Sequence, residues 1–364
     1  SASEVGEAIA EGWRDAAPAD ETVVRPLSDG GPGFLDVVAA SLDCRRFAVE
    51  TVDPLGRPVT GEVLLAGEDT GYVESAQACG LHLLAPGERD PKITTSYGLG
   101  TLLAVAVETG ARRIVVGLGG SATNDAGAGM LAALGAAPLD AAGYALPYGG
   151  AALAGVAALG GAPRLRGATL IAATDVDSPL TGLHGASNVF GPQKGASRED
   201  VLLLDAALGR FAGVLEKGLP GCPPGLVALP GGGAAGGIGA AILALGGRCE
   251  SGIELVRRLS GLDAALDACD LVITGEGSFD HQSLRGKVVA GVAQAAQERG
   301  VPCLVVAGRA SAGRREAAAV GISEVHSLVE HFGGEQRGGV DAAMTRPTEG
   351  LRELAGRLAR QWSR

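Results

Sequence analysis

The stretch from Ile114 to Gly135, IVVGLGGSATNDAGAGMLAALG, constrains the fold more than any other part of the chain. It begins with a β-branched run typical of a buried strand, and four glycines then follow between Gly117 and Gly127. The apolar residues from Met130 to Leu134 have the spacing of a buried helix face, which Gly135 can end. We therefore predict a strand, a glycine-rich turn and a helix in direct succession.

Such a turn can bind an anion, because unpaired backbone N–H groups and the positive end of the helix dipole point into it. Ser121, Thr123 and Asn124 add side-chain donors, and Asp125 adds a carboxylate that could hold a metal. The alternative is a tight strand-to-helix connection in which glycine is needed only for steric reasons. Because glycine-rich turns are common in α/β proteins, local sequence leaves both interpretations open.

Length and composition limit the classes of protein to consider. A chain of 364 residues predicts two domains, and 46% hydrophobic residues exclude a disordered chain despite 60 glycines. The net charge of −11 argues against nucleic acid or an anionic membrane as a partner. The six cysteines show no CxxC pair or metal-ligand spacing, and no apolar run has the length of a signal peptide or a membrane span. We expect a soluble, cytoplasmic protein.

The remaining patterns predict an α/β protein in two parts. Residues 1–43 and 260–364 form a flavodoxin-like domain with a doubly wound parallel sheet, and residues 44–259 form a second α/β domain inserted into it. The strands predicted for the outer domain are 22–27, 270–274, 302–307 and 324–329. In the inserted domain we predict an antiparallel hairpin from Phe47 to Gly67, helices at 73–84 and 96–109, and a strand at 170–174 that leads to Asp175.

The outer domain lacks one strand of this pattern. Its first helix, 1–16, has no strand before it, and a strand order of 2-1-3-4-5 would put the absent strand in the middle of the sheet. Either the natural chain has further N-terminal residues or another segment fills this place, and we favour the first. We expect that restoring about fifteen to twenty upstream residues would raise both stability and turnover.

Two nucleotide-binding motifs can be tested directly. A P-loop is excluded, because Val288 follows the pair Gly286 and Lys287 and no glycine stands five residues before Gly286. The residues from Gly117 to Ala122 fit the dinucleotide fingerprint GxGxxA, and Asp140 lies near the distance of a ribose-binding acid. Asp140 follows what looks like a turn and not a strand, which argues against NAD.

The segment from 275 to 287, GEGSFDHQSLRGK, is the most polar loop at any predicted strand end. Phosphoryl transfer needs a carboxylate to accept a hydroxyl proton, carboxylates for Mg²⁺, and cations for the moving phosphoryl charge. The segment holds all three classes. For Glu276 and Asp280 we favour function over an ordinary solvated loop, and for His281 we favour an incidental surface position.

These motifs identify a resemblance to a known family. The chain resembles the type I bacterial glycerate kinases, and the resemblance is carried by six segments in the order of the family: PLSDGG at 26–31, TSYGLG at 95–100, GLGGSATNDAGAGM at 117–130, TDV and NVFGPQKGA at 174–176 and 188–196, PGGGAAGGIGAA at 230–241, and DLVITGEGSFDHQSLRGK at 270–287. The resemblance implies transfer of the ATP γ-phosphoryl group to D-glycerate with Mg²⁺, which would give 2-phosphoglycerate, in a fold similar to the one predicted above.

The resemblance also implies roles for individual residues. We expect Gly119, Gly120, Ser121, Ala122, Thr123 and Asn124 to bind nucleotide phosphates. We expect Asp175 and Glu276 to hold the metal. Asp280 is the expected base, and Lys194 and Lys287 are the expected catalytic cations. The residues expected to bind substrate are Asp29, Gln282, Ser283 and Arg285.

Two features depart from the family pattern. Members usually begin with a strand and a DSFKGS-like loop before the residue matching Ser1, and this chain has Pro32 and Phe34 where the family has Glu and Thr. Two other functions are therefore kept as alternatives: an NAD-linked oxidoreductase using Gly117 to Ala122, and a truncated protein that binds ligand without turnover. The sequence does not indicate an oligomeric state.

Overall fold

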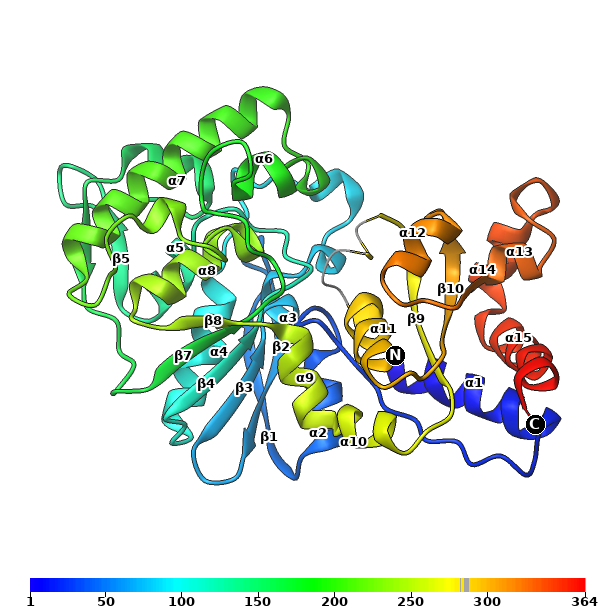
Figure 1. The fold of residues 1–364 in the computed structure, drawn as a ribbon. Coiled ribbons are helices and arrows are strands. Elements are labelled where there is room, and N and C mark those ends of the chain that lie inside the picture. The colour runs from blue at the N-terminus through cyan, green and yellow to red at the C-terminus, as the bar shows by residue number, and fades with distance from the viewer. Residues whose placement is uncertain (282, 285–287, 364) are drawn as a thin grey trace. The chain divides into compact units, whose positions relative to one another are not determined.

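The computed structural model describes residues 1–281, 283–284 and 288–363, which form two compact units (Figure 1). The first unit comprises Ser1–Ser28 and the chain from Ile253 onward, and the second comprises Asp29–Gly252. The mixed α/β class and the insertion of one unit into the other agree with the prediction. The boundaries differ from the predicted ones, because residues 29–43 belong to the inserted unit and residues 253–259 belong to the first unit.

A six-stranded sheet forms the centre of the second unit, with strand order β1-β2-β3-β4-β7-β8. Its strands are β1 (Cys44–Val52), β2 (Pro58–Ala66), β3 (Thr70–Glu74), β4 (Arg113–Gly117), β7 (Thr169–Ala173) and β8 (Arg248–Glu250). The first three strands are antiparallel to one another, and β3, β4, β7 and β8 are parallel. The expected hairpin and the strands at 113–116 and 170–174 are thus confirmed.

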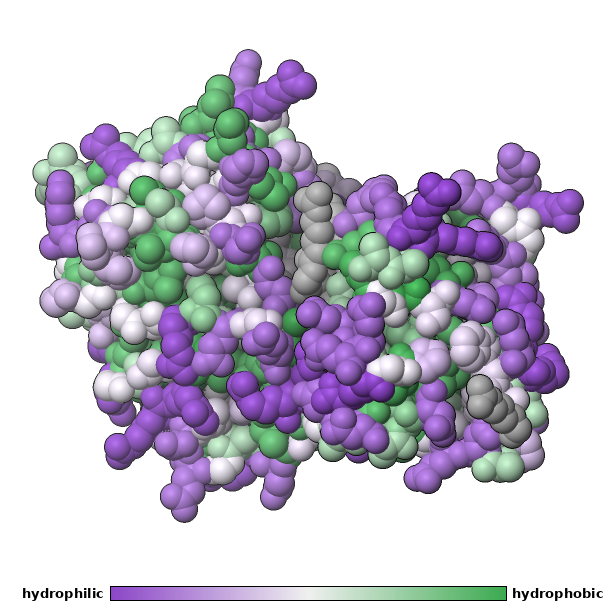
Figure 2. Space-filling view, in the orientation of Figure 1, coloured by the Kyte–Doolittle hydropathy of each residue, from purple (hydrophilic) through white to green (hydrophobic). Residues whose placement is uncertain are grey.

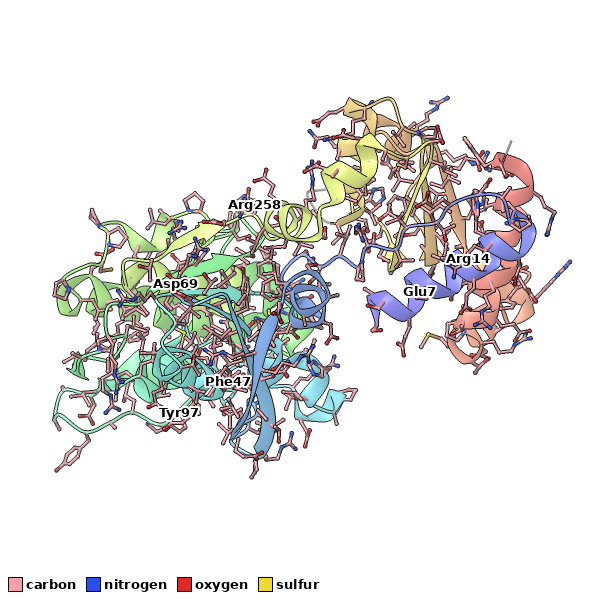
Figure 3. All side chains as sticks on the ribbon, turned by 90° about the horizontal axis from the view of Figure 1, so that it is seen from below. Glu7, Arg14, Phe47, Asp69, Tyr97 and Arg258 are labelled. Carbon is pink, nitrogen blue, oxygen red and sulfur yellow. The ribbon has the colours of Figure 1, made fainter. Side chains whose placement is uncertain are left out.

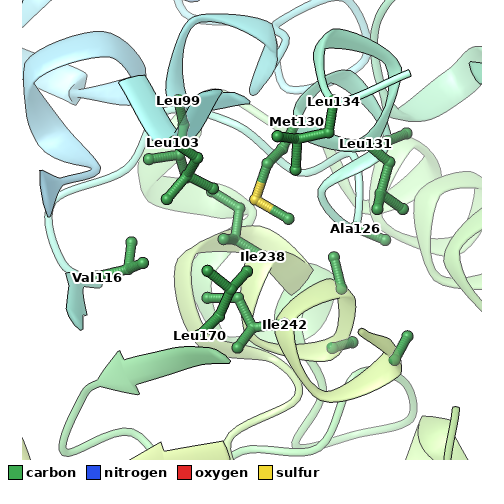
Figure 4. Close-up of a cluster of buried hydrophobic side chains, with 14 of the residues drawn as sticks. Leu99, Leu103, Val116, Ala126, Met130, Leu131, Leu134, Leu170, Ile238 and Ile242 are labelled. Atoms are coloured by element: carbon green, nitrogen blue, oxygen red, sulfur yellow. The ribbon is translucent and has the colours of Figure 1, made fainter. Parts of the chain in front are cut away.

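Helices cover both faces of this sheet. The helices of this unit are α2 (Phe34–Ser41), α3 (Ala76–Cys79), α4 (Tyr97–Glu108), α5 (Ala128–Ala133), α6 (Ala186–Phe190), α7 (Arg198–Gly218) and α8 (Ala234–Ala244). Side chains of α4, α5 and α8 pack against Val116 and Leu170 in the main core (Figure 4). On the opposite face, Phe34 of α2 contacts Tyr72 with ring centroids 6.3 Å apart, which is why α2 belongs to this unit.

A small separate sheet lies beyond α5. Strand β5 (Ala136–Leu139) pairs antiparallel with β6 (Ala158–Gly161), and neither was predicted. The predicted helix at 73–84 is correct only in part, because β3 occupies its start and only the short helix α3 and a 3₁₀ turn, Leu81–Leu83, follow. All five residues of β3 are buried, so pairing with β2 and β4 stabilises an extended conformation there.

The first unit contains a three-stranded parallel sheet of order β11-β10-β9. The strands are β9 (Val272–Phe279), β10 (Cys303–Ala310) and β11 (Glu324–Ser327). The helices are α1 (Ala2–Ala16), α9 (Gly252–Ser260), α10 (Leu262–Asp267), α11 (Val288–Glu298), α12 (Arg314–Ala319), α13 (Leu328–His331), α14 (Gly339–Thr345) and α15 (Pro347–Trp362). Alternate residues of β10 enter two cores: Cys303 and Val305 face α10 and α11, whereas Leu304 and Val306 face α1 and α15.

Helix α1 confirms the predicted first helix, and a side chain caps its start. The Ser1 hydroxyl accepts a hydrogen bond from the Glu4 amide, and the Glu4 carboxylate accepts one from the Ser1 backbone nitrogen. This pair of hydrogen bonds is a capping box. Two turns apart on this helix, the exposed side chains of Glu7 and Arg14 approach to 3.7 Å (Figure 3). Hydrophilic side chains spread over the visible face of each unit, with apolar ones between them (Figure 2).

The predicted strand at 22–27 is wrong. This segment has an extended appearance in sequence but pairs with no strand among the described residues, so β9 is an edge of the sheet. Together with α1 and α15, the segment and β9 line a cavity of about 1840 Å³ within the first unit. In the described part of the chain, no helix is both long and apolar enough to cross a bilayer.

Candidate active site

The carboxyl ends of β3, β4, β7 and β8 meet at one edge of the six-stranded sheet, because these neighbouring strands are parallel. Glu74 ends β3 and Gly117 ends β4, while β7 leads directly into Thr174 and Asp175. Open parallel sheets bind ligands at such an edge, where loops present polar groups. This edge is the candidate site of the second unit.

The turn that begins at Asp29 lies directly against these strand ends. A Cβ on Gly30 would collide with the carbonyl oxygen of Ala173, and a Cβ on Gly119 would lie 2.6 Å from the Cα of Gly31. Gly30 also has a φ of +92°, which L side chains rarely adopt. The Asp29 Oδ1 accepts a hydrogen bond from the Gly31 amide at 3.1 Å. Backbone contacts between glycines thus place Asp29 at the edge of the sheet.

Glu74 connects the end of β3 to the same turn. Its Oε2 accepts hydrogen bonds from the amides of Gly33 and Leu35, at 3.1 and 3.2 Å. Helix α2 has no side-chain cap from its own N-cap residue, so this buried carboxylate satisfies its first amides. Burial raises the pKa of Glu74, and the amide hydrogen bonds oppose that shift.

Asp175 lies beside Asp29 at this edge. The Ser251 hydroxyl donates to Asp175 Oδ1 at 2.6 Å. A Cβ on Gly252 would collide with the Asp29 carbonyl oxygen and would lie 3.3 Å from Asp175 Oδ2, so the two aspartates flank one glycine. The structure therefore brings together two residues predicted separately, one as a substrate ligand and one as a metal ligand.

Only part of the predicted nucleotide loop is accessible. Gly119 is half-buried and Gly120 is exposed, whereas residues 121–124 are buried. The Ala122 amide donates to the Cys79 carbonyl oxygen at 2.7 Å. The binding of phosphate by 119–124 stays a prediction, and the first two glycines are the part of it that solvent reaches.

Asp125 is fully buried and accepts four hydrogen bonds. Its Oδ2 accepts from the amide and the hydroxyl of Ser96, both at 2.9 Å, and from the Gly129 amide at 3.1 Å. Its Oδ1 accepts from the Gly127 amide at 3.1 Å. The first amides of α5 thus bind this carboxylate, which corrects two expectations: an external anion at that helix end, and Asp125 as a metal ligand. Burial raises the pKa of Asp125, against the effect of these donors.

Lys194 is buried in the same region. It ends the 3₁₀ turn Pro192–Lys194, and its Nζ donates to the Ser121 hydroxyl and to the Thr123 carbonyl oxygen. Burial lowers the pKa of Lys194 to about 7, and the charge of Asp125 opposes this shift.

In the first unit, β9 is longer than predicted. It continues through Phe279, so Glu276 lies within a strand opposite Ala307 and not in a loop. Asp280 follows the strand. Its amide donates a hydrogen bond to the Ser283 hydroxyl at 3.0 Å, and the Ser283 amide donates one to the Asp280 carbonyl oxygen at 3.1 Å. His281 is 70% exposed at its side chain, as expected of a surface residue. The remaining predicted residues, Gln282, Arg285 and Lys287, lie outside the described residues.

The two predicted metal ligands belong to different units, Asp175 to the second and Glu276 to the first. Among the described residues, no group of three or more His, Cys, Asp or Glu side chains could hold a metal ion. Binding of Mg²⁺ by this pair stays a prediction.

Several polar residues of the site were not predicted. Glu74 was not predicted because its segment has the sequence pattern of a helix. Three serines form hydrogen bonds with residues far away in sequence, which no local pattern indicates: Ser96, Ser187 and Ser251. The one available signal was position: Glu74 and Ser251 both follow or end strands at the carboxyl edge of the sheet.

Comparison with known proteins identifies the family. The model of the glycerate kinase family matches residues 1–363. The chain belongs to the glycerate kinase family. It is 44% identical over 314 residues to the glycerate 2-kinase of Escherichia coli (strain K12), covering 85% of this chain and 81% of that protein. It is 39% identical over 334 residues to the glycerate kinase of Bacillus subtilis (strain 168), covering 90% and 87%.

A solved structure supports the same assignment. The crystal structure of a protein designated glycerate kinase 2 from Salmonella typhimurium LT2 matches with a TM-score of 0.79 and 38% identity. The match covers 99% of this chain and 94% of that one. The α/β fold and the kinase class of this glycerate kinase family member are thereby established.

Proposed function

We propose that this chain transfers the γ-phosphoryl group of ATP to D-glycerate and forms 2-phosphoglycerate. The observation that carries the proposal is family membership across residues 1–363. The names of relatives support the substrate, since the Escherichia coli protein is a glycerate 2-kinase and the Bacillus subtilis protein a glycerate kinase. The first of these names also supports the position of phosphorylation.

The backbone at Gly119 and Gly120 supports nucleotide binding. Gly120 has a φ of +62° and is exposed, and Gly119 packs on Gly31 without an intervening side chain. A phosphate group can approach backbone amides most closely where no Cβ intervenes. We therefore assign the ATP phosphates to this part of the 119–124 loop.

The carboxylate of Asp175 is a ligand type that fits Mg²⁺, because this ion prefers one or two carboxylates together with substrate phosphates. When bound, Mg²⁺ would neutralise charge on the phosphates of ATP. Asp175 and Glu276 are the residues that we assign to it.

In the proposed reaction, a hydroxyl oxygen of glycerate bonds to the γ-phosphorus, and the bond from this phosphorus to the β–γ bridging oxygen breaks. The hydroxyl proton passes to a base, which we assign to Asp280 at the end of β9. Asp29 and Ser283 are assigned to the substrate. On sequence grounds alone, Gln282 and Arg285 join them, and Lys287 is assigned to the transferring phosphoryl group.

The geometry disfavours the NAD-linked alternative. Asp140 follows β5, which pairs with β6 in the separate two-stranded sheet and not with β4. The Asp140 Oδ1 accepts hydrogen bonds from the amides of Ala142 and Tyr144, so it caps a turn. A dinucleotide fingerprint needs this acid at the end of the strand beside the glycine-rich turn.

The test is a coupled assay of ADP release with D-glycerate, with glycerol as the control acceptor. Phosphorus NMR of the product distinguishes 2-phosphoglycerate from 3-phosphoglycerate. We expect ADP release that depends on glycerate and Mg²⁺, and a thermal shift with ATP but not with NAD. Glycerate-independent ADP release, or no turnover despite ATP binding, would contradict the proposal.

A further inference from the structure

A buried lysine connects two segments that are far apart in sequence. Lys194 is 2% exposed, and its Nζ lies 2.9 Å from the Ser121 hydroxyl and 2.7 Å from the Thr123 carbonyl oxygen. Both acceptors belong to the loop of residues 119–124, and the side chain that reaches them is buried. The Lys194 side chain therefore makes its hydrogen bonds with the loop of residues 119–124.

A second hydrogen bond joins the same two segments. The Asn124 Nδ2 donates to the Ser187 hydroxyl at 2.8 Å, and both side chains are fully buried. Ser187 lies in α6, a few residues before the turn that carries Lys194. We call the contacts of Lys194 with Ser121 and Thr123, together with this Asn124–Ser187 bond, the buried latch.

The backbone that carries Lys194 is itself held firmly. Gly195 has a φ of +98°, and a Cβ there would collide with the Arg89 carbonyl oxygen. The amides of Lys194 and Ala196 both donate to the Gly191 carbonyl oxygen, at 3.0 Å each. The amine is thus presented to the loop by a turn with little freedom to move.

The surroundings of the amine do not favour direct contact with substrate. A group that touches substrate must reach the reacting atoms, and the Lys194 side chain is enclosed by the loop that it holds. Asp125 and Cys79 are the titratable groups that act on it, and both are buried. Lys194 can therefore act on bound nucleotide only through the loop.

We propose that Lys194 is a positioning residue, which with Ser187 fixes the 121–124 backbone and so holds Gly119 and Gly120 in place for the nucleotide phosphates. The inference rests on the proposed function, because it takes ATP as the ligand of the loop. It revises the expectation that Lys194 is a catalytic cation. It also explains why the segments GLGGSATND and GPQKGA occur together, since the latch needs residues from both.

The first test compares Lys194→Met with Lys217→Met, whose lysine is exposed on α7. Hydrogen exchange of the amides from 117 to 125 reports loop order without any activity measurement. We expect faster exchange there in Lys194→Met only, a rise of about fivefold or more in KM for ATP, and a kcat within about threefold of wild type. A kcat loss of about a hundredfold with unchanged exchange and KM would make Lys194 catalytic and overturn the proposal.

The second test uses Ser187→Ala, which removes only the Asn124–Ser187 hydrogen bond of the latch. This smaller change keeps the proposal testable if Lys194→Met fails to fold. We expect the same pattern with smaller changes in exchange and in KM. Unchanged exchange from 117 to 125 in Ser187→Ala would overturn the latch. Absence of ATP binding by the wild-type protein would refute the proposed function instead, and the exchange measurements would still decide whether the latch exists.

Discussion

The Asp125 carboxylate accepts hydrogen bonds from both the backbone amide and the hydroxyl of Ser96, each at 2.9 Å. Ser96 is the N-cap of α4, and Asp125 also accepts the first amides of α5, so one carboxylate caps two helices. The Ser96 hydroxyl in turn accepts a hydrogen bond from the Met130 amide at 3.0 Å. Buried hydrogen bonds of Asp125 and Ser96 thus hold the glycine-rich turn in place.

Asp125→Asn tests this arrangement. The amide would turn one acceptor into a donor that faces backbone N–H groups, and unsatisfied buried donors are costly. We expect the free energy of unfolding to fall by about 3 kcal/mol, measured by urea denaturation. Asp15→Asn, an exposed site, is the control. A loss no greater than that of the control would contradict the role of Asp125.

Glu74 is expected to stabilise α2 and the Asp29 turn. Glu74→Ala removes the acceptor of the Gly33 and Leu35 amides and should cost about 2 kcal/mol. Glu74→Gln keeps an acceptor oxygen and should recover at least half of the loss. Equal losses in the two variants, measured by denaturation, would show that side-chain volume and not the hydrogen bonds is responsible.

Gly120→Val should weaken ATP binding while the fold persists. Gly120 has a φ of +62°, and a Cβ there would lie 3.0 Å from the Pro32 ring. We expect a fall in ATP affinity of about tenfold or more by calorimetry, since a branched side chain would block approach to the backbone. Gly110→Val is the matched control, because Gly110 has a φ of +97° and open space around it. Unchanged affinity in a folded Gly120→Val protein would remove the loop from the nucleotide site.

Asp280 and Glu276 should give different kinetic signatures. If Asp280 accepts the hydroxyl proton, Asp280→Asn should lower kcat by about a hundredfold or more with KM largely kept. If Glu276 binds Mg²⁺, Glu276→Gln should raise the Mg²⁺ concentration needed for half-maximal rate. His281→Ala serves as the control at an exposed position. Equal, modest rises in KM for both acidic variants would leave them as binding residues only.

Local patterns predicted the elements whose burial is continuous along the chain. The run before Gly117 became β4, and the apolar spacing after Gly127 became α5, with Gly135 beyond its end. Segment 22–27 shows the limit of this approach. Its β-branched residues favour an extended backbone, but a strand also needs a partner, and no described strand pairs with it.

Long-range contacts account for what the sequence did not predict. β3 is short, and its place between β2 and β4 is fixed by residues about forty positions away in the register Tyr72 to Val115. The buried state of Lys194 depends likewise on Ser121 and Thr123, which share no local pattern with it. Residue type suggested a cation for phosphate, whereas burial and partners indicate one that holds a loop.

Lys194 should make stability depend on pH. Burial lowers its pKa from 10.5 to about 7 in the folded protein, with Asp125 and Cys79 opposing the shift. Between these values the unfolded chain binds a proton that the folded chain does not, so this residue's contribution to the free energy of unfolding rises with pH across that window. We therefore expect the free energy of unfolding of the wild type, minus that of Lys194→Met, to become more positive as pH rises, by at most about 1.4 kcal/mol per pH unit. Urea denaturation of both proteins measures this difference. A difference that stays constant or shrinks from pH 7 upward would contradict a neutral buried amine.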